Sequence, residues 1–170
     1  VGTFDEFRIY DRALSPEEIT TLKNRRSFYS PTNLNPNSEL TIAENQPVGT
    51  IVGEFNATDP DGDSITYHLV DENGSTNNNL FTLEQNGSLK TAVLFDYETN
   101  ASTYTITVQA KDELNATTEG NFTVTLENIF EDLDGDGTED HLDDDMDGDG
   151  FTNAEELAIG QTQEVRSACP

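Results

Sequence analysis

Thirteen acidic residues and no Lys or Arg lie between Glu131 and Glu156. Their spacing places oxygen-bearing side chains at positions 1, 3, 5, 9 and 12 of a twelve-residue loop, with Gly at position 6, and it does so twice. The first copy runs from Asp132 to Asp143 and the second from Asp145 to Glu156. This is the spacing of a calcium-binding loop, and a segment so acidic would repel itself without a cation. The sequence therefore predicts bound Ca²⁺.

Each loop offers five side chains and the backbone carbonyl at position 7 as ligands. The candidates are Asp132, Asp134, Asp136, Thr138, Asp140 and Asp143 in the first loop, and Asp145, Asp147, Asp149, Phe151, Asn153 and Glu156 in the second. Asp143 stands where a bidentate Glu normally sits, so the first site is expected to be weaker unless Asp144 or Asp145 bridges. The segment 132–160 resembles thrombospondin type 3 repeats and related EF-hand-like loops. We expect a short helix over 154–159, ended by Gly160, and a tail over 161–170.

The middle of the chain is rich in Val, Ile, Thr, Phe and Tyr at strand spacing. Strands are predicted at 39–43, 50–57, 64–70, 80–83, 88–91, 103–110 and 120–127. The alternation is clear in 103–110, where Tyr104, Ile106, Val108 and Ala110 would face inward. Seven strands in about ninety residues favour a mainly β fold, a seven-stranded Greek-key sandwich.

Five short motifs follow one another on this strand pattern. They are Ala43-Glu44-Asn45, Ala57-Thr58-Asp59-Pro60-Asp61, Phe95-Asp96-Tyr97-Glu98, Ala110-Lys111-Asp112 and the exit Glu127-Asn128-Ile129-Phe130-Glu131. In this order they resemble the calcium motifs of cadherin domains, and the resemblance covers 38–131. It implies a cadherin-like sandwich that binds calcium at its two poles. The implied ligands are Glu44, Asp96, Glu98, Asn128 and Glu131 at the lower pole, and Asp59, Asp61 and Asp112 at the upper pole.

The chain departs from the cadherin pattern in two ways. Asn128 stands where the family usually has Asp, and no second cadherin module follows, so its ligands are missing unless the acidic repeats supply them. Simpler readings also exist. Asp59 and Asp61 would serve equally in a β-turn, and Asp96 and Glu98 as surface acids.

The first residues carry a third resemblance. The stretch GTFDEFRIYDRAL alternates like a strand, and a helix is expected from Ser15, with Ser15 as N-cap, Pro16 at its first position and Glu18 closing a capping box. This resembles the end of a laminin-G-like, concanavalin-type jelly roll. The expected organisation is therefore a jelly-roll fragment at 1–29, a linker at 30–37, a cadherin-like domain at 38–131 and calcium repeats at 132–160.

Charge and motif content narrow the possible functions. A net charge of −26 excludes nucleic acid and anionic membrane surfaces as partners that bind by charge. No catalytic motif is present, so no enzyme is predicted, and no transmembrane run is found. We expect a calcium-binding structural or adhesion region of a secreted or cell-surface protein, with other surface proteins or glycans contacted through neighbouring domains. The alternative is the non-catalytic part of an extracellular carbohydrate-binding protein or polysaccharide hydrolase.

Overall fold

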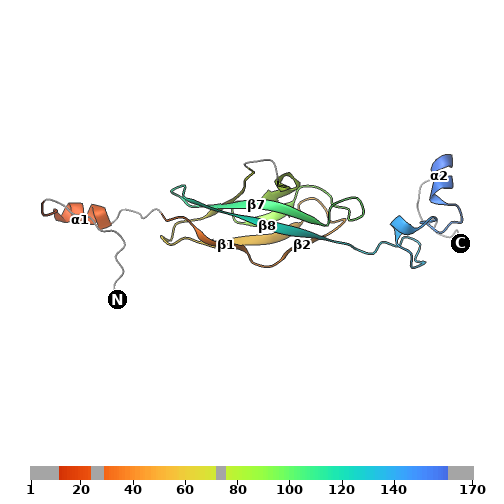
Figure 1. The fold of residues 1–170 in the computed structure, drawn as a ribbon, viewed down its shortest axis with the longest axis horizontal. Helices are drawn as coiled ribbons and strands as arrows, with labels where there is room; N and C mark the ends of the chain where they lie inside the picture. The colour runs from red at the N-terminus through yellow and green to blue at the C-terminus, as the bar shows by residue number, and fades with distance from the viewer. Residues whose placement is uncertain (1–11, 24–28, 72–75, 161–170) are drawn as a thin grey trace, which may run out of the picture.

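The structure is a computed structural model that describes residues 12–23, 29–71 and 76–160. A β-sandwich lies between a short helix near the N-terminus and an irregular acidic segment near the C-terminus (Figure 1). The helices are α1 (Pro16–Lys23) and α2 (Asn153–Ile159), and single 3₁₀ turns occupy Asn78–Leu80 and Asp140–Leu142. The strands are β1 (Thr32–Pro36), β2 (Leu40–Ala43), β3 (Ile51–Thr58), β4 (Thr66–Leu69), β5 (Phe81–Leu83), β6 (Ser88–Thr91), β7 (Thr103–Lys111) and β8 (Thr117–Glu127).

The strands form two four-stranded sheets. One sheet has the order β1-β3-β6-β5 and the other the order β2-β8-β7-β4. The pair β2–β8 is parallel, with Leu40 opposite Val124 and Ala43 opposite Glu127. The other described pairs are antiparallel. The mainly β sandwich expected from the sequence is confirmed.

One hydrophobic core fills the space between the sheets. In β7 the predicted alternation is present, because Tyr104, Ile106, Val108 and Ala110 are all buried. Three aromatic rings pack together in this core. Phe81 and Tyr104 both contact Phe95, with ring centroids 5.6 and 5.0 Å from that of Phe95. The remaining core residues are Leu34, Leu40, Ile42, Val52, Phe55, Tyr67, Leu89, Val124 and Leu126.

The prediction of a linker over 30–37 is wrong for Thr32–Pro36, which forms the edge strand β1. The sequence TNLNP has low strand propensity. Pairing with β3 overrides that preference, with Thr32 opposite Thr58 and Pro36 opposite Phe55. Leu34 inserts into the core, and an edge position tolerates Pro because its missing N–H is not needed by a neighbour. The sandwich therefore has eight described strands and not seven.

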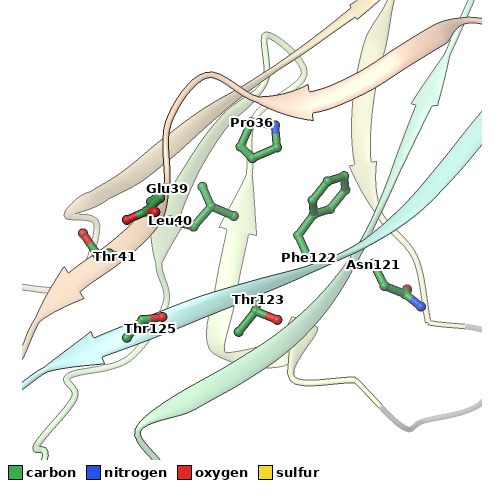
Figure 2. A pocket seen from close by; sticks show the side chains of 8 residues that line it. All are labelled: Pro36, Glu39, Leu40, Thr41, Asn121, Phe122, Thr123 and Thr125. Atoms are coloured by element: carbon green, nitrogen blue, oxygen red, sulfur yellow. The ribbon is translucent and has the colours of Figure 1, made fainter.

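The chain changes sheets between β1 and β2. A groove of about 480 Å³ opens at this crossing, beside the edge of β8 (Figure 2). Its lining residues are Pro36, Glu39, Leu40, Thr41, Asn121, Phe122, Thr123 and Thr125. None of these residues is a candidate ligand, so the groove is separate from the acidic clusters.

The helices near both ends of the described chain are capped. The backbone N–H of Ser15 donates to Glu18, and the N–H of Glu18 donates to the Ser15 hydroxyl, so the expected capping box is confirmed. Thr152 and Glu155 form a second capping box at α2, and Gly160 ends that helix with φ of 72°. The strand expected over Phe4–Tyr10 lies outside the described residues.

Gly87 supplies a test of the sandwich. It turns the β5–β6 hairpin with φ of 98°, and a Cβ there would lie 2.5 Å from the carbonyl oxygen of Phe55. We expect Gly87→Ala to lower the free energy of unfolding by about 2–5 kcal/mol, from left-handed backbone strain together with overpacking. The matched control is Gly49→Ala, because Gly49 has φ of 92° and open space around it. Gly49→Ala should lower the free energy of unfolding only by the cost of the left-handed backbone, about 1–2 kcal/mol. Denaturant titration in the presence of chelator measures the free energy of unfolding of both variants. Equal decreases in the two variants would contradict overpacking at Gly87.

Candidate metal centres

Three carboxylates meet at the lower pole, the end of the sandwich where β2 finishes. Glu44 follows β2, whereas Asp96 and Glu98 lie in the turn after β6, and oxygens of all three lie within 4.8 Å of one another. Glu44 is only 1% exposed. Its Oε2 accepts the N–H of Tyr97 at 2.6 Å and its Oε1 the N–H of Ile129 at 2.8 Å. These bonds hold Glu44 in place and join β2, the turn and the chain exit at one point.

The chain exit runs back across the same pole. The side-chain amide of Asn45 donates to the Glu131 carboxylate, and the carbonyl of Glu131 accepts the N–H of Asp140 at 2.9 Å. Burial raises the pKa of Glu131, and the negative charges of Glu44, Glu98, Asp140 and Asp96 raise it further, in that order. Negative charges of both the sandwich and the acidic segment 132–160 therefore act on Glu131.

His141 lies between acids of both parts. Its Nδ1 is 3.9 Å from Oε1 of Glu98 and 3.7 Å from Oε2 of Glu139. The carboxylate side chains are 19% and 22% exposed, respectively, so both are turned away from solvent. The acidic segment thus contacts the lower pole through side chains as well as through its backbone.

The upper pole carries a cluster at the opposite end of the sandwich. Asp59, Asp61 and Asp63 follow β3, with oxygens within 4.8 Å of one another. Oδ1 of Asp59 accepts the N–H groups of Asp61 and Asp63. Oδ2 of Asp59 is buried and accepts no hydrogen bond from any residue in the described ranges. The N–H of Tyr29 donates to Asp61 at 3.0 Å, so the chain entering the sandwich closes this loop.

The upper cluster differs in one member from the set that the sequence implied. Asp63 joins Asp59 and Asp61, whereas Asp112 is not part of this cluster. Oδ1 of Asp112 instead accepts the N–H groups of Leu114 and Ala116 in the β7–β8 turn. The signal for Asp63 was present in the sequence, because D-P-D-G-D repeats the D-x-D-G-D spacing of both acidic loops.

In the first acidic loop, 132–143, Asp132, Asp134 and Asp136 meet within 4.8 Å. The N–H of Asp136 bonds to Asp134 and lowers its pKa, but burial and the charges of Asp136, Asp143 and Asp132 outweigh this bond and raise it overall. Asp143 is therefore close enough to act on the same cluster. Asp140 accepts the N–H of Leu133 at 2.7 Å, which closes the loop across its width. Thr138 donates its N–H to Asp136.

The second acidic loop, 145–156, repeats this arrangement. Asp145, Asp147 and Asp149 meet within 4.8 Å, and Asn153 accepts the N–H of Met146 just as Asp140 accepts that of Leu133. The backbone N–H of Phe151 donates to Asp149. The predicted metal ligand of Phe151 is its backbone carbonyl. Glu156, at position 12, is only 1% exposed.

The two acidic loops also contact each other. A Cβ added at Gly148 would lie 2.5 Å from Oδ2 of Asp134, so the loops touch at this position and a side chain there would displace Asp134. The side-chain amide of Asn153 donates to the carbonyl of Asp143, which links the end of one loop to the other. The acidic segment therefore behaves as one unit of two loops.

These donor sets fit calcium. They consist almost entirely of carboxylate oxygens, which a hard divalent cation prefers. Oδ1 of Asp145, like Oδ2 of Asp59, is buried and accepts no hydrogen bond from the described part of the chain. A buried carboxylate oxygen without a donor is costly unless a cation faces it. Asn128 is exposed, and its role as a ligand stays a prediction.

Comparison with known proteins places the sandwich in a family. The family model of the cadherin domain matches residues 38–127, just over half of the 170-residue chain. The chain belongs to the cadherin family. Cadherin domains are extracellular adhesion modules and not enzymes, and the family in general binds calcium.

Relatives of this cadherin chain are large proteins. Desmocollin 2-like protein of Danio rerio is 32% identical over 106 residues, which are 58% of this chain and 11% of that protein. Cadherin-related family member 2 of Mus musculus is 39% identical over 98 residues, 54% of this chain and 7% of that protein. The chain thus spans about a tenth or less of the curated relatives it matches.

Solved structures of cadherins share the fold. Protocadherin Gamma B2 extracellular cadherin domains 1–5 match with a TM-score of 0.50 and 25% identity, over 62% of this chain and 20% of that one. Drosophila N-cadherin EC1-4 matches with a TM-score of 0.50 and 21% identity, over 58% and 25%. Within the described residues of this cadherin chain, no helix has the length and apolar character needed to cross a membrane.

Glu131 offers a direct measurement of the charge gathered at the lower pole. In chelator, its carboxylate should titrate above the ordinary value of 4.5, because burial and four neighbouring acids disfavour its ionised form. Protonation then favours the folded state, so this contribution to stability is complete below pH 4.5 and is lost as pH rises through the raised pKa. Carbon-13 NMR of the side-chain carboxyl measures the pKa.

Glu155 is the internal control for this titration. The N–H of Thr152, and then its hydroxyl, lower the pKa of Glu155. It should titrate below 4.5 in the same spectra. A Glu131 that titrates together with Glu155 would show that the acids do not gather at the pole.

Proposed function

We propose that this chain is a calcium-binding structural region of a secreted or cell-surface multidomain adhesion protein. The observation that carries the proposal is the set of four clusters, one at each pole of the cadherin domain and one in each acidic loop, each with three carboxylates within 4.8 Å. The function is to hold neighbouring parts of the protein at fixed angles. The thrombospondin type 3-like character of 132–160 and the jelly-roll ending at 1–29 are part of this proposal.

The lower pole supports the proposal through preorganisation. Glu44 is buried, and two backbone N–H groups hold its carboxylate in position. Asp96 is similarly restrained, because its Oδ1 accepts the N–H groups of Glu98 and Thr99. Carboxylates held close together without a counter-ion repel one another and lower the free energy of unfolding. A divalent cation bound among them raises the free energy of unfolding instead.

The size of the effect follows from linkage. Extracellular modules bind calcium with dissociation constants of roughly 10⁻⁴–10⁻³ M, which at millimolar calcium gives about 0.5–1.5 kcal/mol for each site. Such a contribution is a large part of the stability of a small domain. Several sites together would decide whether the acidic segment is compact or expanded, since residues 132–156 contain few apolar side chains.

Calcium removal tests the lower pole. Chelation should lower the melting temperature of the chain, by roughly 4–8 °C for each kcal/mol lost. Asp96→Asn should remove the part of this response that comes from the lower pole, because it deletes one charge from the lower-pole set. Asp61→Asn should remove less, since the upper cluster lacks the additional field of Glu131. Calorimetric titration of the two variants measures the difference, and a melting curve unaffected by calcium would sink the assignment.

The second acidic loop should bind calcium more tightly than the first. Glu156 supplies a longer arm at position 12 than Asp143, and a shorter arm cannot easily coordinate with both oxygens. NMR shifts of the Gly150 amide should therefore saturate at lower calcium than those of Gly137. Asp143→Glu is the informative variant, because it keeps the charge and restores the arm. In this variant the Gly137 and Gly150 amides should saturate at similar calcium concentrations. Unchanged midpoints for both amides would refute the idea that the short side chain of Asp143 weakens the first loop.

A further inference from the structure

The upper pole repeats the turn that begins each acidic loop. Asp59 to Asp63 read D-P-D-G-D, and the first five residues of the two acidic loops read D-L-D-G-D and D-M-D-G-D. The backbone repeats as well, because φ of the glycine is 79° at Gly62, 80° at Gly135 and 65° at Gly148. Glycine adopts this left-handed conformation without the strain that a side chain imposes. The same turn therefore brings three carboxylates within 4.8 Å of one another at three places in the chain.

The first Asp of the upper turn has an oxygen that faces no donor. Oδ1 of Asp59 accepts the N–H groups of Asp61 and Asp63, at 2.8 and 3.1 Å. Its Oδ2 is buried and accepts no hydrogen bond from the residues that the structure describes. Oδ1 of Asp145, the first Asp of the second acidic loop, is buried in the same way. Because a buried carboxylate oxygen without a donor is costly, these two oxygens indicate a cation at the same position of both turns.

Asp112 serves a different purpose at this pole. It is 5% exposed, and its Oδ1 accepts the N–H groups of Leu114 and Ala116, both at 2.8 Å. The upper turn contacts the β7–β8 turn through another residue, since the N–H of Ser64 donates to Glu113 at 3.4 Å. Asp112 therefore shapes the β7–β8 turn and is not one of the three carboxylates that meet.

We propose that Asp63 is a calcium ligand of the upper pole, and that the turn 59–63 binds the ion as a third copy of the acidic-loop turn, without Asp112. This inference rests on the proposed function, which already assigns the upper cluster to calcium, and it changes the ligand set and the kind of site. The carboxylates come from five consecutive residues, and water supplies the remaining oxygens that calcium takes. The ion would also hold Asp61, whose Oδ2 accepts the N–H of Tyr29, and so fix the chain that enters the sandwich.

The experiment titrates the full chain with calcium and follows amide shifts by NMR. Gly62 reports on the upper pole because its N–H donates to the carbonyl of Asp59, and Gly150 reports on the second acidic loop because its N–H donates to Asp145. Asp63→Asn removes one charge from the upper turn while keeping the size of the side chain. We expect this variant to bind calcium about tenfold more weakly at Gly62, with the midpoint at Gly150 unchanged.

Asp112→Asn is the matched control. It removes the same charge, and the amide oxygen of Asn still accepts the two N–H groups of the β7–β8 turn. It should change the affinity at Gly62 by less than about twofold. Hydrogen exchange of the Tyr29 amide gives a second readout, because that N–H donates to Asp61. Calcium should slow this exchange in the wild-type chain and in Asp112→Asn, but not in Asp63→Asn.

The outcomes separate this inference from the proposed function. If Asp63→Asn weakens binding at Gly62 no more than Asp112→Asn does, the inference is overturned and the proposed function stands. If Gly62 of the wild-type chain does not respond to calcium while Tyr97 and Gly150 do, the upper site is refuted and calcium binding by the rest of the chain stands. If none of the three amides responds, the proposed function itself is refuted.

Discussion

Mutual repulsion among carboxylates is the constraint on which this structure depends. The chain has a net charge of −26 and gathers much of it at three places, the two poles of the sandwich and the acidic segment. Backbone N–H groups restrain many of these acids, most completely at Glu44 and Asp132, where each of the two carboxylate oxygens accepts one. The fold therefore gathers carboxylate oxygens into clusters of the kind that a hard metal ion prefers.

The apolar core makes this concentration of charge possible. β7 and β8 pair along nine residues, from Thr103 opposite Thr125 to Lys111 opposite Thr117, and bury a continuous apolar face between the sheets. The stability gained there offsets the repulsion at the ends. The acidic segment has no such core, so its arrangement depends on turns, on the contact between Asp134 and Gly148, and on cations.

The sequence predicts the parts of the molecule that follow a local rule. Period-two alternation locates β7, the capping box at Ser15 begins α1, and Gly160 ends α2. β1 was missed because its residues have little strand preference, and only pairing with β3 makes it a strand. Asp63 is absent from the predicted set because the cadherin motif implies Asp112 in its place. The contact of His141 with Glu98 depends on how the acidic segment folds back, which loop spacing does not encode. Tertiary contacts between distant segments explain the omission of β1 and of the contact between His141 and Glu98.

The parallel pairing of β2 with β8 has a mechanical consequence. The chain enters the sandwich near the upper pole, where Tyr29 contacts Asp61, and leaves it at the lower pole, where Ile129 contacts Glu44. Tension applied along the chain pulls β2 backward and β8 forward, so the two strands slide past each other along their length. In this shear geometry the hydrogen bonds of the pair share the load, whereas a hairpin pulled from its open end would release them one at a time. The pairing of β2 with β8 is therefore expected to resist extension between the two ends of the domain.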